Sequence, residues 1–298
     1  MIYSFIILHY QAFEDTIECV DSIFNNIKRD DYNIIIVDNK SPNDSGKILQ
    51  KKYNGHPKVK IIELDKNIGF ANGNNIGCEY AYKTYNSDFY IVINNDTIIE
   101  DRLFVDKIID IYKETHFDVL GPCIWSIVDE VDQNPVPYPT DSLKKSFKAL
   151  LYNIALFVLN FVNKDTALIR FVDGKRSKRT KNNTVLGGRT ESEKGIKLHG
   201  AAVIFSNKYY SKYKSAFDPR TFMYCEEDIL YSRIKNDKLV SIYNSTLKIL
   251  HKEDVASNAV MSNGQLRRRF KFKHSIWSSF VLLRIYMHSW FRSLRSRY

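Results

Sequence analysis

Residues 33–41 read NIIIVDNKS, a run of β-branched side chains that ends in Asp38, Asn39, Lys40 and Ser41. Such a run, bounded by turn-forming polar residues, is typical of a buried β-strand. Similar runs lie on either side of it, and a longer stretch of helical character follows each one. The four pairs are Tyr3–His9 with Asp15–Asn26, Asn33–Val37 with Asp44–Tyr53, Lys58–Leu64 with Asn72–Tyr85, and Phe89–Ile93 with Asp101–Glu114. Parallel neighbours need a crossover connection, so this repeat predicts an α/β fold with a doubly wound, mostly parallel, Rossmann-like sheet.

Acidic residues follow three of these strands at the point where each strand ends: Asp38, Asp65 and Asp96. In open sheets of this kind, ligands bind beyond the carboxyl ends of the strands, so the three acids could face one crevice. Any single one could equally begin a turn or cap the next helix.

The segment Asn67–Gly77 (NIGFANGNNIG) is rich in glycine and asparagine and joins a strand to a helix. Such a loop can bring backbone N–H groups and a helix N-terminus close to phosphate. Gly69, Gly73 and Gly77 fall four apart, which is not the G-x-G-x-x-G spacing of dinucleotide-binding proteins. A purely structural turn explains the segment equally well.

The alternation of strands and helices stops after Gly121, and we expect a basic insertion over about residues 141–195. The loop before it contains Pro135, Pro137 and Pro139. Strand-like or helix-like patterns return in the segments Leu198–Phe205, Lys208–Lys214, Val240–Tyr243 and Leu247–Leu250, the last of which leads to His251.

The charge of the chain is concentrated in two segments. Residues 144–181 carry a net charge of +8 and residues 265–298 carry +9, which leaves −7 for the rest of a chain whose total is +10. Two basic, aromatic-rich segments are therefore attached to an acidic body. This pattern indicates an anionic surface as the partner of the segments rather than of the body.

Several classes of protein are disfavoured by the composition. Cys19, Cys78, Cys123 and Cys225 lie far apart, which suggests neither a zinc site nor a disulfide framework and fits a reducing compartment. The first residues, MIYSFIILHYQ, lack a basic region and read as a strand, so we expect no export. The longest apolar stretch, Ala149–Val162, is shorter than the roughly 20 residues that span a bilayer.

Six ordered motifs together resemble glycosyltransferase family 2, whose members have the GT-A fold, and especially its bacterial members that build surface polysaccharides. The motifs are IIIVDNKS at 34–41, LDKNIGFANGNNIG at 64–77, VINNDT at 92–97, HGAAVIF at 199–205, FMYCEEDILYSRI at 222–234 and LHKEDVAS at 250–257. The resemblance implies a GT-A catalytic domain over residues 1–255, followed by a basic, helical extension over residues 256–298.

The resemblance further implies a nucleotide-sugar donor and a divalent metal, Mg²⁺ or Mn²⁺, bridging its diphosphate. Asp38 would contact the base or ribose, while Asp96 and His251 would ligate the metal. The full set of expected donor-binding residues is His9, Tyr10, Asp38, Asn67, Gly69, Asn72, Asn95 and Asp96. The family motif is often Asp-x-Asp, whereas this chain has Asn94-Asn95-Asp96, so one carboxylate is missing. The other histidines, His9 and His199 among them, are expected to be structural or solvent-facing rather than metal ligands.

The acidic run Glu226-Glu227-Asp228 supplies the candidate base. Carboxylates at an exposed helix start interact favourably with the helix dipole without any catalytic role. The family usually has Glu-Asp here, and the register from Tyr224 places Glu227 at the position of the base, with Asp228 and then Glu226 as further candidates. The implied reaction is an inverting displacement by an acceptor hydroxyl. The Asn67–Gly77 loop is similar to that of relatives that use dTDP-rhamnose or UDP-hexoses.

The C-terminal segment has the pattern of an amphipathic helix that can bind an anionic membrane. Its apolar side contains Ile276, Phe280, Leu283, Met287, Trp290 and Leu294, and another side contains Arg284, His288, Arg292 and Arg295. The alternative is a helix packed on the catalytic domain with a solvated basic face. With membrane binding, the enzyme would be cytoplasmic and peripheral on the cytosolic face, and its acceptor would be a saccharide linked to a polyprenyl lipid.

Three other classes compete with this interpretation. A catalytically inactive member of the family would bind a nucleotide sugar without transferring it. A nucleic-acid binder would use the same basic, aromatic segments, but the acidic body would repel a polyanion. A nicotinamide-dependent oxidoreductase would need a glycine fingerprint after the first strand, where this chain reads His9-Tyr10-Gln11.

Overall fold

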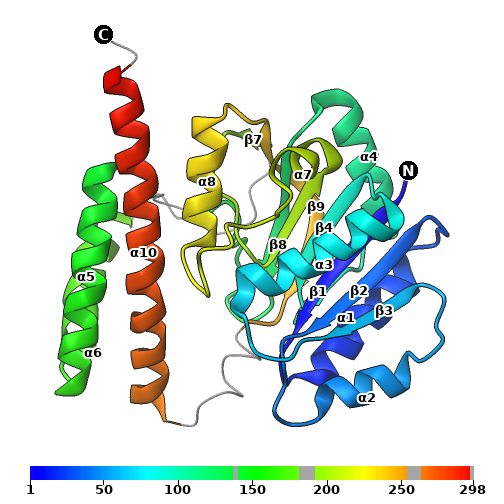
Figure 1. Cartoon of the computed structure of the whole chain (residues 1–298), viewed down its shortest axis with the longest axis horizontal. Coiled ribbons are helices and arrows are strands. Elements are labelled where there is room, and N and C mark those ends of the chain that lie inside the picture. The colour runs from blue at the N-terminus through cyan, green and yellow to red at the C-terminus, as the bar shows by residue number, and fades with distance from the viewer. Residues whose placement is uncertain (137–139, 181–191, 254–262, 296–298) are drawn as a thin grey trace.

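The computed structural model of the chain describes residues 1–136, 140–180, 192–253 and 263–295. Its centre is a mixed, mostly parallel β-sheet with helices on both faces (Figure 1). The strands are β1 Tyr3–His9, β2 Tyr32–Asp38, β3 Val59–Glu63, β4 Phe89–Asn94, β5 Thr97–Ile98, β6 Val119–Ser126, β7 Glu193–Lys194, β8 Ala202–Ser206 and β9 Ser241–His251. The helices are α1 Phe13–Asn26, α2 Ser45–Lys52, α3 Gly69–Tyr85, α4 Phe104–Thr115, α5 Leu143–Phe161, α6 Asp165–Thr180, α7 Asn207–Tyr213, α8 Glu226–Asn236 and α10 Gly264–Arg295. The predicted α/β class and the GT-A-like sheet are confirmed.

The strand order is β3-β2-β1-β4-β8-β6-β9-β5, and β7 pairs with β9. Strands β3, β2, β1 and β4 are parallel, whereas β8 runs antiparallel between β4 and β6. The short strand β5, directly after β4, pairs with the end of β9, where Thr97 lies opposite His251. This pairing brings the end of β9 next to the end of β4, although the two segments are far apart in the sequence.

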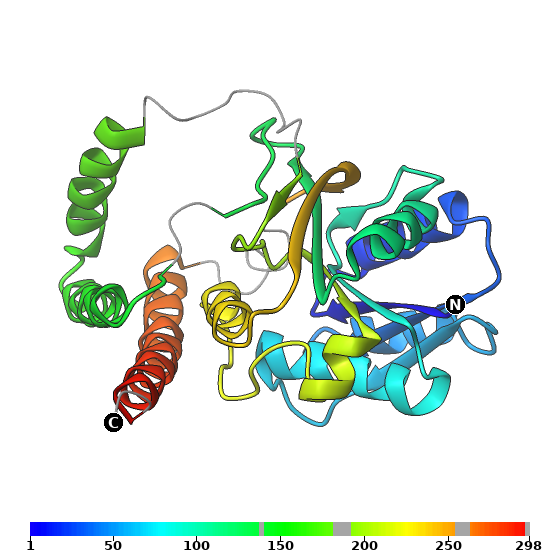
Figure 2. The same cartoon turned by 90° about the horizontal axis from the view of Figure 1, so that it is seen from above.

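The core consists of two layers of side chains, one on each face of the sheet. Ile34 and Ile36 of β2 belong to the layer that includes buried residues of α1, α2 and α4, whereas Ile35 and Val37 belong to the layer with α3, α7 and α8. Figure 2 shows helices on both sides of the sheet. Successive side chains of a strand point to opposite faces, so a strand buried on both sides must be apolar throughout. This requirement explains why the run at 34–37 has no polar alternation.

Part of the sheet differs from the prediction. The two predicted strands at 240–243 and 247–250 form one strand, β9, with an irregularity in its pairing with β6. Asn244 pairs with Pro122, and Lys248 already pairs with the next residue, Cys123. The strand β6 was not predicted, because Gly121 and Pro122 interrupt its β-branched pattern. The side chains of these strands are nevertheless largely buried.

The helices α5, α6 and α10 form a further layer outside α8 (Figures 1 and 2). Val281 and Leu282 of α10 are buried against Ile229 of α8. Asn153 of α5 donates a hydrogen bond of 2.9 Å to the hydroxyl of Ser279 in α10. The basic insertion and the C-terminal segment, separate in the sequence, thus pack together. Within the described ranges, no helix is both long and apolar enough to cross a bilayer.

Candidate functional site

Two predicted donor-binding residues, His9 and Asp38, end adjacent parallel strands and lie opposite each other. Asp38 is buried, and its Oδ1 accepts hydrogen bonds from the backbone N–H and the hydroxyl of Ser41, at 3.1 and 2.6 Å. His9 is fully buried, with its ring nitrogens 2.7 Å from Thr16 Oγ1 and 2.8 Å from Ser45 Oγ. Burial lowers the pKa of His9 to about 4, so the ring is neutral at pH 7. His9 is therefore an internal hydrogen-bonding residue beside Asp38.

The loop at the start of α3 is fastened to the end of β2. Asn39 accepts a hydrogen bond of 2.9 Å from the backbone N–H of Ile68 and donates one of 3.3 Å to the carbonyl of Gly69. Asn67 Oδ1 accepts a hydrogen bond of 2.9 Å from the N–H of Gly69. Gly69 has a φ of +84°, and an added Cβ would lie 2.0 Å from the carbonyl oxygen of Phe222. The loop conformation therefore requires glycine at this position.

The asparagines of α3 hold the segment that leads into α8. Asn72 Nδ2 donates to the carbonyl oxygens of residues 219 and 221, at 3.1 and 3.3 Å. Asn75 donates to the carbonyl of Phe217 at 2.9 Å and accepts from its N–H at 3.0 Å. The segment so held ends at the first turn of α8, which carries Glu227. Asn72 was predicted to bind the donor, and its positioning contact was not predicted, although both asparagines lie in the quoted motif.

Replacing Gly69 by alanine is expected to destabilise the fold by about 2–4 kcal/mol, because it adds an overlap with Phe222 to the strain of a positive φ. Gly55→Ala is the matched control: its φ is +72°, but no atom lies within 4 Å of an added Cβ. The control is expected to cost about 1 kcal/mol. Chemical unfolding of both variants measures the difference, and equal losses would show that the close approach to Phe222 contributes nothing.

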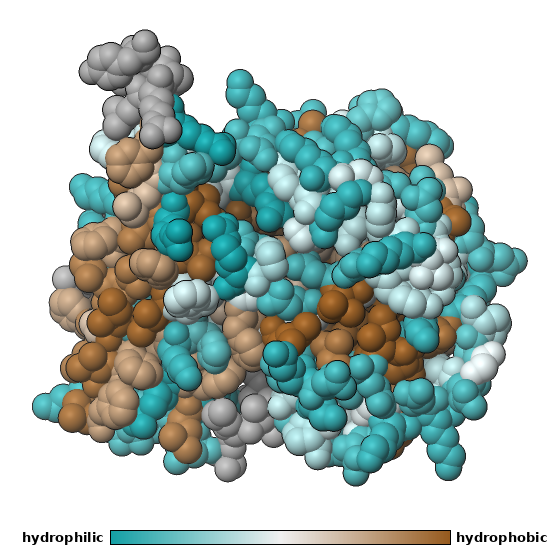
Figure 3. All heavy atoms as spheres, in the orientation of Figure 1, coloured by the Kyte–Doolittle hydropathy of each residue, from teal (hydrophilic) through white to brown (hydrophobic). Residues whose placement is uncertain are grey.

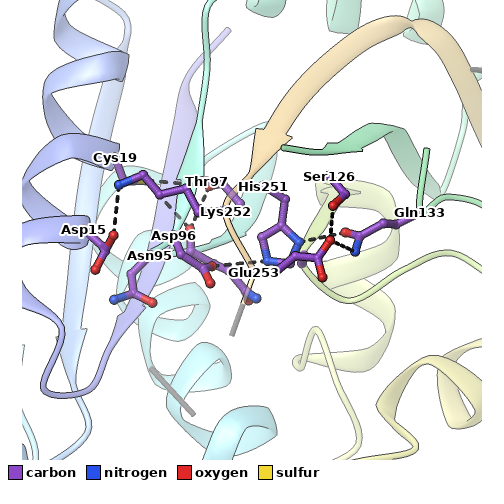
Figure 4. Close-up of polar contacts among 12 residues, drawn as sticks. Asp15, Cys19, Asn95, Asp96, Thr97, Ser126, Gln133, His251, Lys252 and Glu253 are labelled. Atoms are coloured by element: carbon purple, nitrogen blue, oxygen red, sulfur yellow. Dashed lines mark hydrogen bonds and ion pairs between the residues drawn. The ribbon is translucent and has the colours of Figure 1, made fainter. Parts of the chain in front are cut away.

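Asp96 and His251 face each other beyond the ends of β4 and β9 (Figure 4). Asp96 Oδ1 lies 3.3 Å from His251 Nε2, and both residues are buried. Neither of these two atoms has a hydrogen-bond partner in the described part of the chain. The neighbouring Asn95 turns toward α1, where its Nδ2 donates to Thr16 Oγ1 at 3.0 Å, and Tyr10 is partly exposed. Buried polar atoms without a hydrogen-bond partner are rare in folded proteins, so these two atoms indicate a binding position for another group.

A short network orients the ring of His251. Its Nδ1 lies 2.7 Å from Gln133 Oε1, which must accept, so Nδ1 carries a proton; in the neutral ring the lone pair is then on Nε2, the atom that faces Asp96. Gln133 Nε2 in turn donates to Glu253 Oε1 at 2.8 Å, and Ser126 also hydrogen-bonds to Glu253 (Figure 4). Gln133 was not predicted as a site residue, because it lies in the loop after β6 and none of the six motifs contains it.

These residues fit a hard divalent cation. Ligand atoms next to each other around an octahedral ion, at about 2.1 Å from it, are about 3 Å apart, close to the observed 3.3 Å between Asp96 and His251. Among the described residues no group of three His, Cys, Asp or Glu side chains could hold a metal. Asp96 and His251 are thus two side chains that could hold such a cation, which would leave its further coordination positions open to other oxygen ligands.

Glu227, in the first turn of α8, lies against the chain segment that precedes β8. An added Cβ at Gly200 would be 2.9 Å from Glu227 Oε1, so glycine permits the carboxylate to approach the chain before β8. The preceding residue, His199, has its ring centroid 6.1 Å from that of His251. Burial lowers the pKa of His199, and the charge of Glu227 opposes this shift. We refer to Asp96, His251, His199 and Glu227 as the strand-end cluster.

The two acidic neighbours of Glu227 are engaged differently. Asp228 forms a buried ion pair of 2.9 Å with Lys197 and accepts a hydrogen bond of 2.7 Å from the N–H of Thr140. Glu226 is buried, and one of its carboxyl oxygens has no partner within the described residues. Burial raises the pKa of Glu226 to about 8, so this carboxyl group is largely protonated at pH 7. Glu227 is the most exposed of the three.

The amino-acid sequence is similar to those of known glycosyltransferases. The model of the family described as glycosyl transferase family 2 matches residues 4–175. A low-salt glycan biosynthesis hexosyltransferase of Haloferax volcanii, Agl10, is 24% identical over 147 residues, which are 49% of this chain and 44% of the relative. The chain thus spans less than half the length of this curated relative.

Solved structures with a similar fold include two of S. aureus TarS. The structure of its residues 1–349 has a TM-score of 0.51 and 12% identity, covering 99% of this chain and 73% of that one. A longer TarS chain has a TM-score of 0.52 and 12% identity, covering 85% of this chain and 37% of that one. At this level of identity the likeness shows the fold.

Proposed function

Because the chain belongs to glycosyltransferase family 2, we propose that it transfers one sugar from a nucleotide-sugar donor to a hydroxyl of a saccharide acceptor, with inversion at the anomeric carbon. The observation that supports this most is the strand-end cluster. It joins two unpartnered ligand atoms, on Asp96 and His251, to the carboxylate of Glu227 through His199. Such a site offers both a metal-binding edge and a base, which are the two requirements of this reaction.

In this proposal the donor lies along the ends of β1, β2 and β4. Asp38 faces the base or ribose, and the loop at Asn67–Gly69, fastened by Asn39, borders the donor. Asp96 and His251 hold Mg²⁺ or Mn²⁺, which when bound neutralises the charge of the diphosphate and makes it a better leaving group. The leading donors are dTDP-rhamnose and UDP-hexoses.

Glu227 is the proposed base. It accepts the proton of the acceptor hydroxyl as that oxygen bonds to the anomeric carbon from the face opposite the diphosphate. The bond from the anomeric carbon to the diphosphate oxygen breaks, and the nucleoside diphosphate leaves with the bonding electrons. A single enzymic base is sufficient, and the sugar is inverted.

The surroundings of the two other candidates support the choice of Glu227. Asp228 is already neutralised by Lys197, and removing a carboxylate from a buried ion pair would leave Lys197 unpaired. Glu226 holds its own proton near pH 7, so it is a poor proton acceptor. Glu227 alone combines access with closeness to His199.

Release of nucleoside diphosphate from a panel of nucleotide sugars, with and without saccharide acceptors, tests this function. We expect acceptor-dependent release with dTDP-rhamnose or one of the UDP-hexoses. Binding of a nucleotide sugar without release under any of these conditions would instead identify a catalytically inactive relative.

The outer helical layer carries an apolar surface, visible in Figure 3 over α5 and α10. Phe147, Leu151, Ile154, Val158 and Phe161 of α5 are 40–59% exposed and follow one another at spacings of four and three. This spacing places all five on one face of the helix. A contiguous apolar stripe of this length on an exposed helix is typical of a surface that binds a membrane or another protein.

The helix α10 continues this surface. Phe280, Met287 and Trp290 of the predicted apolar side are exposed, whereas Val281 and Leu282 of the same helix are buried inside. The side chains of the predicted residues Leu294 and Arg295 lie outside the described residues. We propose that α5 and α10 bind an anionic membrane on its cytosolic face, where a polyprenyl-linked saccharide is the acceptor in surface-polysaccharide synthesis.

Changing Leu151 and Val158 together to serine is expected to weaken binding to anionic vesicles about tenfold or more, because apolar side chains contribute roughly 1.5–3 kcal/mol each when fully buried. Ile48→Ser changes another exposed apolar position, on α2 and outside this layer; it is the control and should bind as the wild type does. Sedimentation with vesicles at low salt measures both. Unchanged binding of the double variant would remove α5 from the proposed membrane surface.

A further inference from the structure

A cavity lies outside the strand-end cluster, between α8 and α10. Its volume is about 640 Å³, and its lining includes Arg233 of α8 and Arg284, His288 and Arg292 of α10. Arg233 lies six residues after Glu227 in α8, which turns it by about 120° to a different side of the helix. The cavity is therefore separate from the proposed reaction site.

The two carboxylates that line this cavity are already neutralised. Asp218 forms a bidentate contact with Arg220, whose Nη2 lies 2.6 Å from its Oδ2. Asp237 lies 3.6 Å from Lys212 Nζ and accepts a hydrogen bond from the hydroxyl of Tyr213. Each acid of the lining thus already has a basic side chain as its nearest ion-pair partner.

Three other arginines line the cavity without forming an ion pair among the described residues. Arg233 donates to the neutral hydroxyl of Tyr209 at 2.6 Å. Neither Arg284 nor Arg292 forms an ion pair with any side chain in the described ranges. Planar guanidinium groups lining one cavity suit an oxyanion that accepts paired hydrogen bonds, such as a phosphate or a carboxylate.

The cavity also borders the apolar surface of α10. Arg284, His288 and Arg292 are four residues apart and share one face of α10. The residues that precede His288 and Arg292, Met287 and Phe291, lie on the adjacent face and are exposed. Figure 3 shows hydrophilic side chains at this junction, beside the apolar surface. A phosphate with an attached apolar chain would match both parts at once.

We propose that the α8–α10 cavity binds the phosphate of an anionic phospholipid headgroup, while the adjacent face of α10 enters the acyl region. This inference rests on the membrane association proposed above, but it requires no catalytic activity. In this proposal Arg233, Arg284 and Arg292 recognise one phosphate group specifically. A non-specific attraction between a basic helix and a charged surface would not require these particular arginines.

The test compares the full chain with a variant that keeps the charge but loses the forked geometry, Arg284→Lys with Arg292→Lys. Binding is measured to vesicles of phosphatidylcholine alone and of equal parts phosphatidylcholine and phosphatidylglycerol. Arg170→Lys with Arg267→Lys, two exposed arginines of the same helical layer outside the cavity, is the matched control. Titration with inorganic phosphate tests the soluble source of the same chemistry, and unfolding midpoints confirm that the variants fold.

We expect the cavity variant to bind the phosphatidylglycerol vesicles about tenfold more weakly, the effect of one lost charge-assisted hydrogen-bond pair, while the control binds as the wild type does. Equal binding by the cavity variant and the wild type would show that the arginines contribute only their charge, and it would overturn the proposal. Arginine-dependent binding of inorganic phosphate with unaffected vesicle binding would also overturn it, in favour of a soluble ligand. Failure of Leu151→Ser with Val158→Ser to weaken binding would contradict the α5 surface instead, and failure of nucleoside diphosphate release would contradict the transferase function.

Discussion

Glu227→Gln is expected to abolish sugar transfer and to leave donor binding intact. The amide keeps the size and hydrogen-bonding shape of the side chain but cannot accept the acceptor's proton, and loss of a general base costs about 10²–10⁴ in rate. The side chain faces Gly200 and His199 rather than the residues proposed to hold the diphosphate, so nucleotide affinity should not change. Turnover of the nucleotide sugar and calorimetric binding of the nucleoside diphosphate measure the two effects separately.

Glu226→Gln is the matched control for this prediction. Burial raises the pKa of Glu226 to about 8, so at pH 7 the residue is already neutral and an amide resembles it closely. The two substitutions are identical in chemistry and adjacent in the chain, but only the one at Glu227 should stop transfer. Full activity of the Glu227 variant would remove this residue from the mechanism, and equal loss in both variants would indicate damage to the first turn of α8.

The second large effect is expected at Asp96. Asp96→Asn retains the shape of the side chain but removes its charge. The stimulation of UDP or dTDP binding by Mn²⁺ should therefore fall by roughly 100-fold or more. Residues that only hydrogen-bond to a metal ligand cause smaller losses. A chelator should weaken nucleotide binding by the wild type and have no further effect on this variant. Glu100→Gln, which changes an exposed carboxylate four residues later, serves as the control and should respond to Mn²⁺ as the wild type does.

A graded response would distinguish metal binding from simple disruption. Gln133→Ala removes the hydrogen-bond partner of His251 Nδ1 and leaves both proposed ligands in place. Its expected effect on Mn²⁺-dependent binding is about 10-fold, smaller than that of Asp96→Asn. Nucleotide binding that is indifferent to Mn²⁺ in the wild type would refute the assignment of Asp96 and His251 as a metal pair.

The asparagine- and glycine-rich motif shows where sequence reasoning was incomplete. Its composition predicted either an approach to phosphate or a purely structural turn, and the group that lies closest to Gly69 in the structure is the carbonyl of Phe222. Asn72 and Asn75 are used for the segment before α8. A sequence indicates that a position needs glycine or a hydrogen-bonding side chain, but it does not identify a partner about 150 residues away.

The sequence by itself determined the class of the fold and the ends of its first strands. Strand periodicity and the polar residues after each strand are local properties, and they sufficed to place Asp38 and Asp96 at one edge of a parallel sheet. Only the tertiary structure decided that β5 pairs with β9, which sets His251 against Asp96, and that α5 packs on α10 with an apolar stripe facing outward. These contacts join segments far apart in the chain, and their energies depend on burial and on the pairing of polar atoms, neither of which exists until the whole chain has folded.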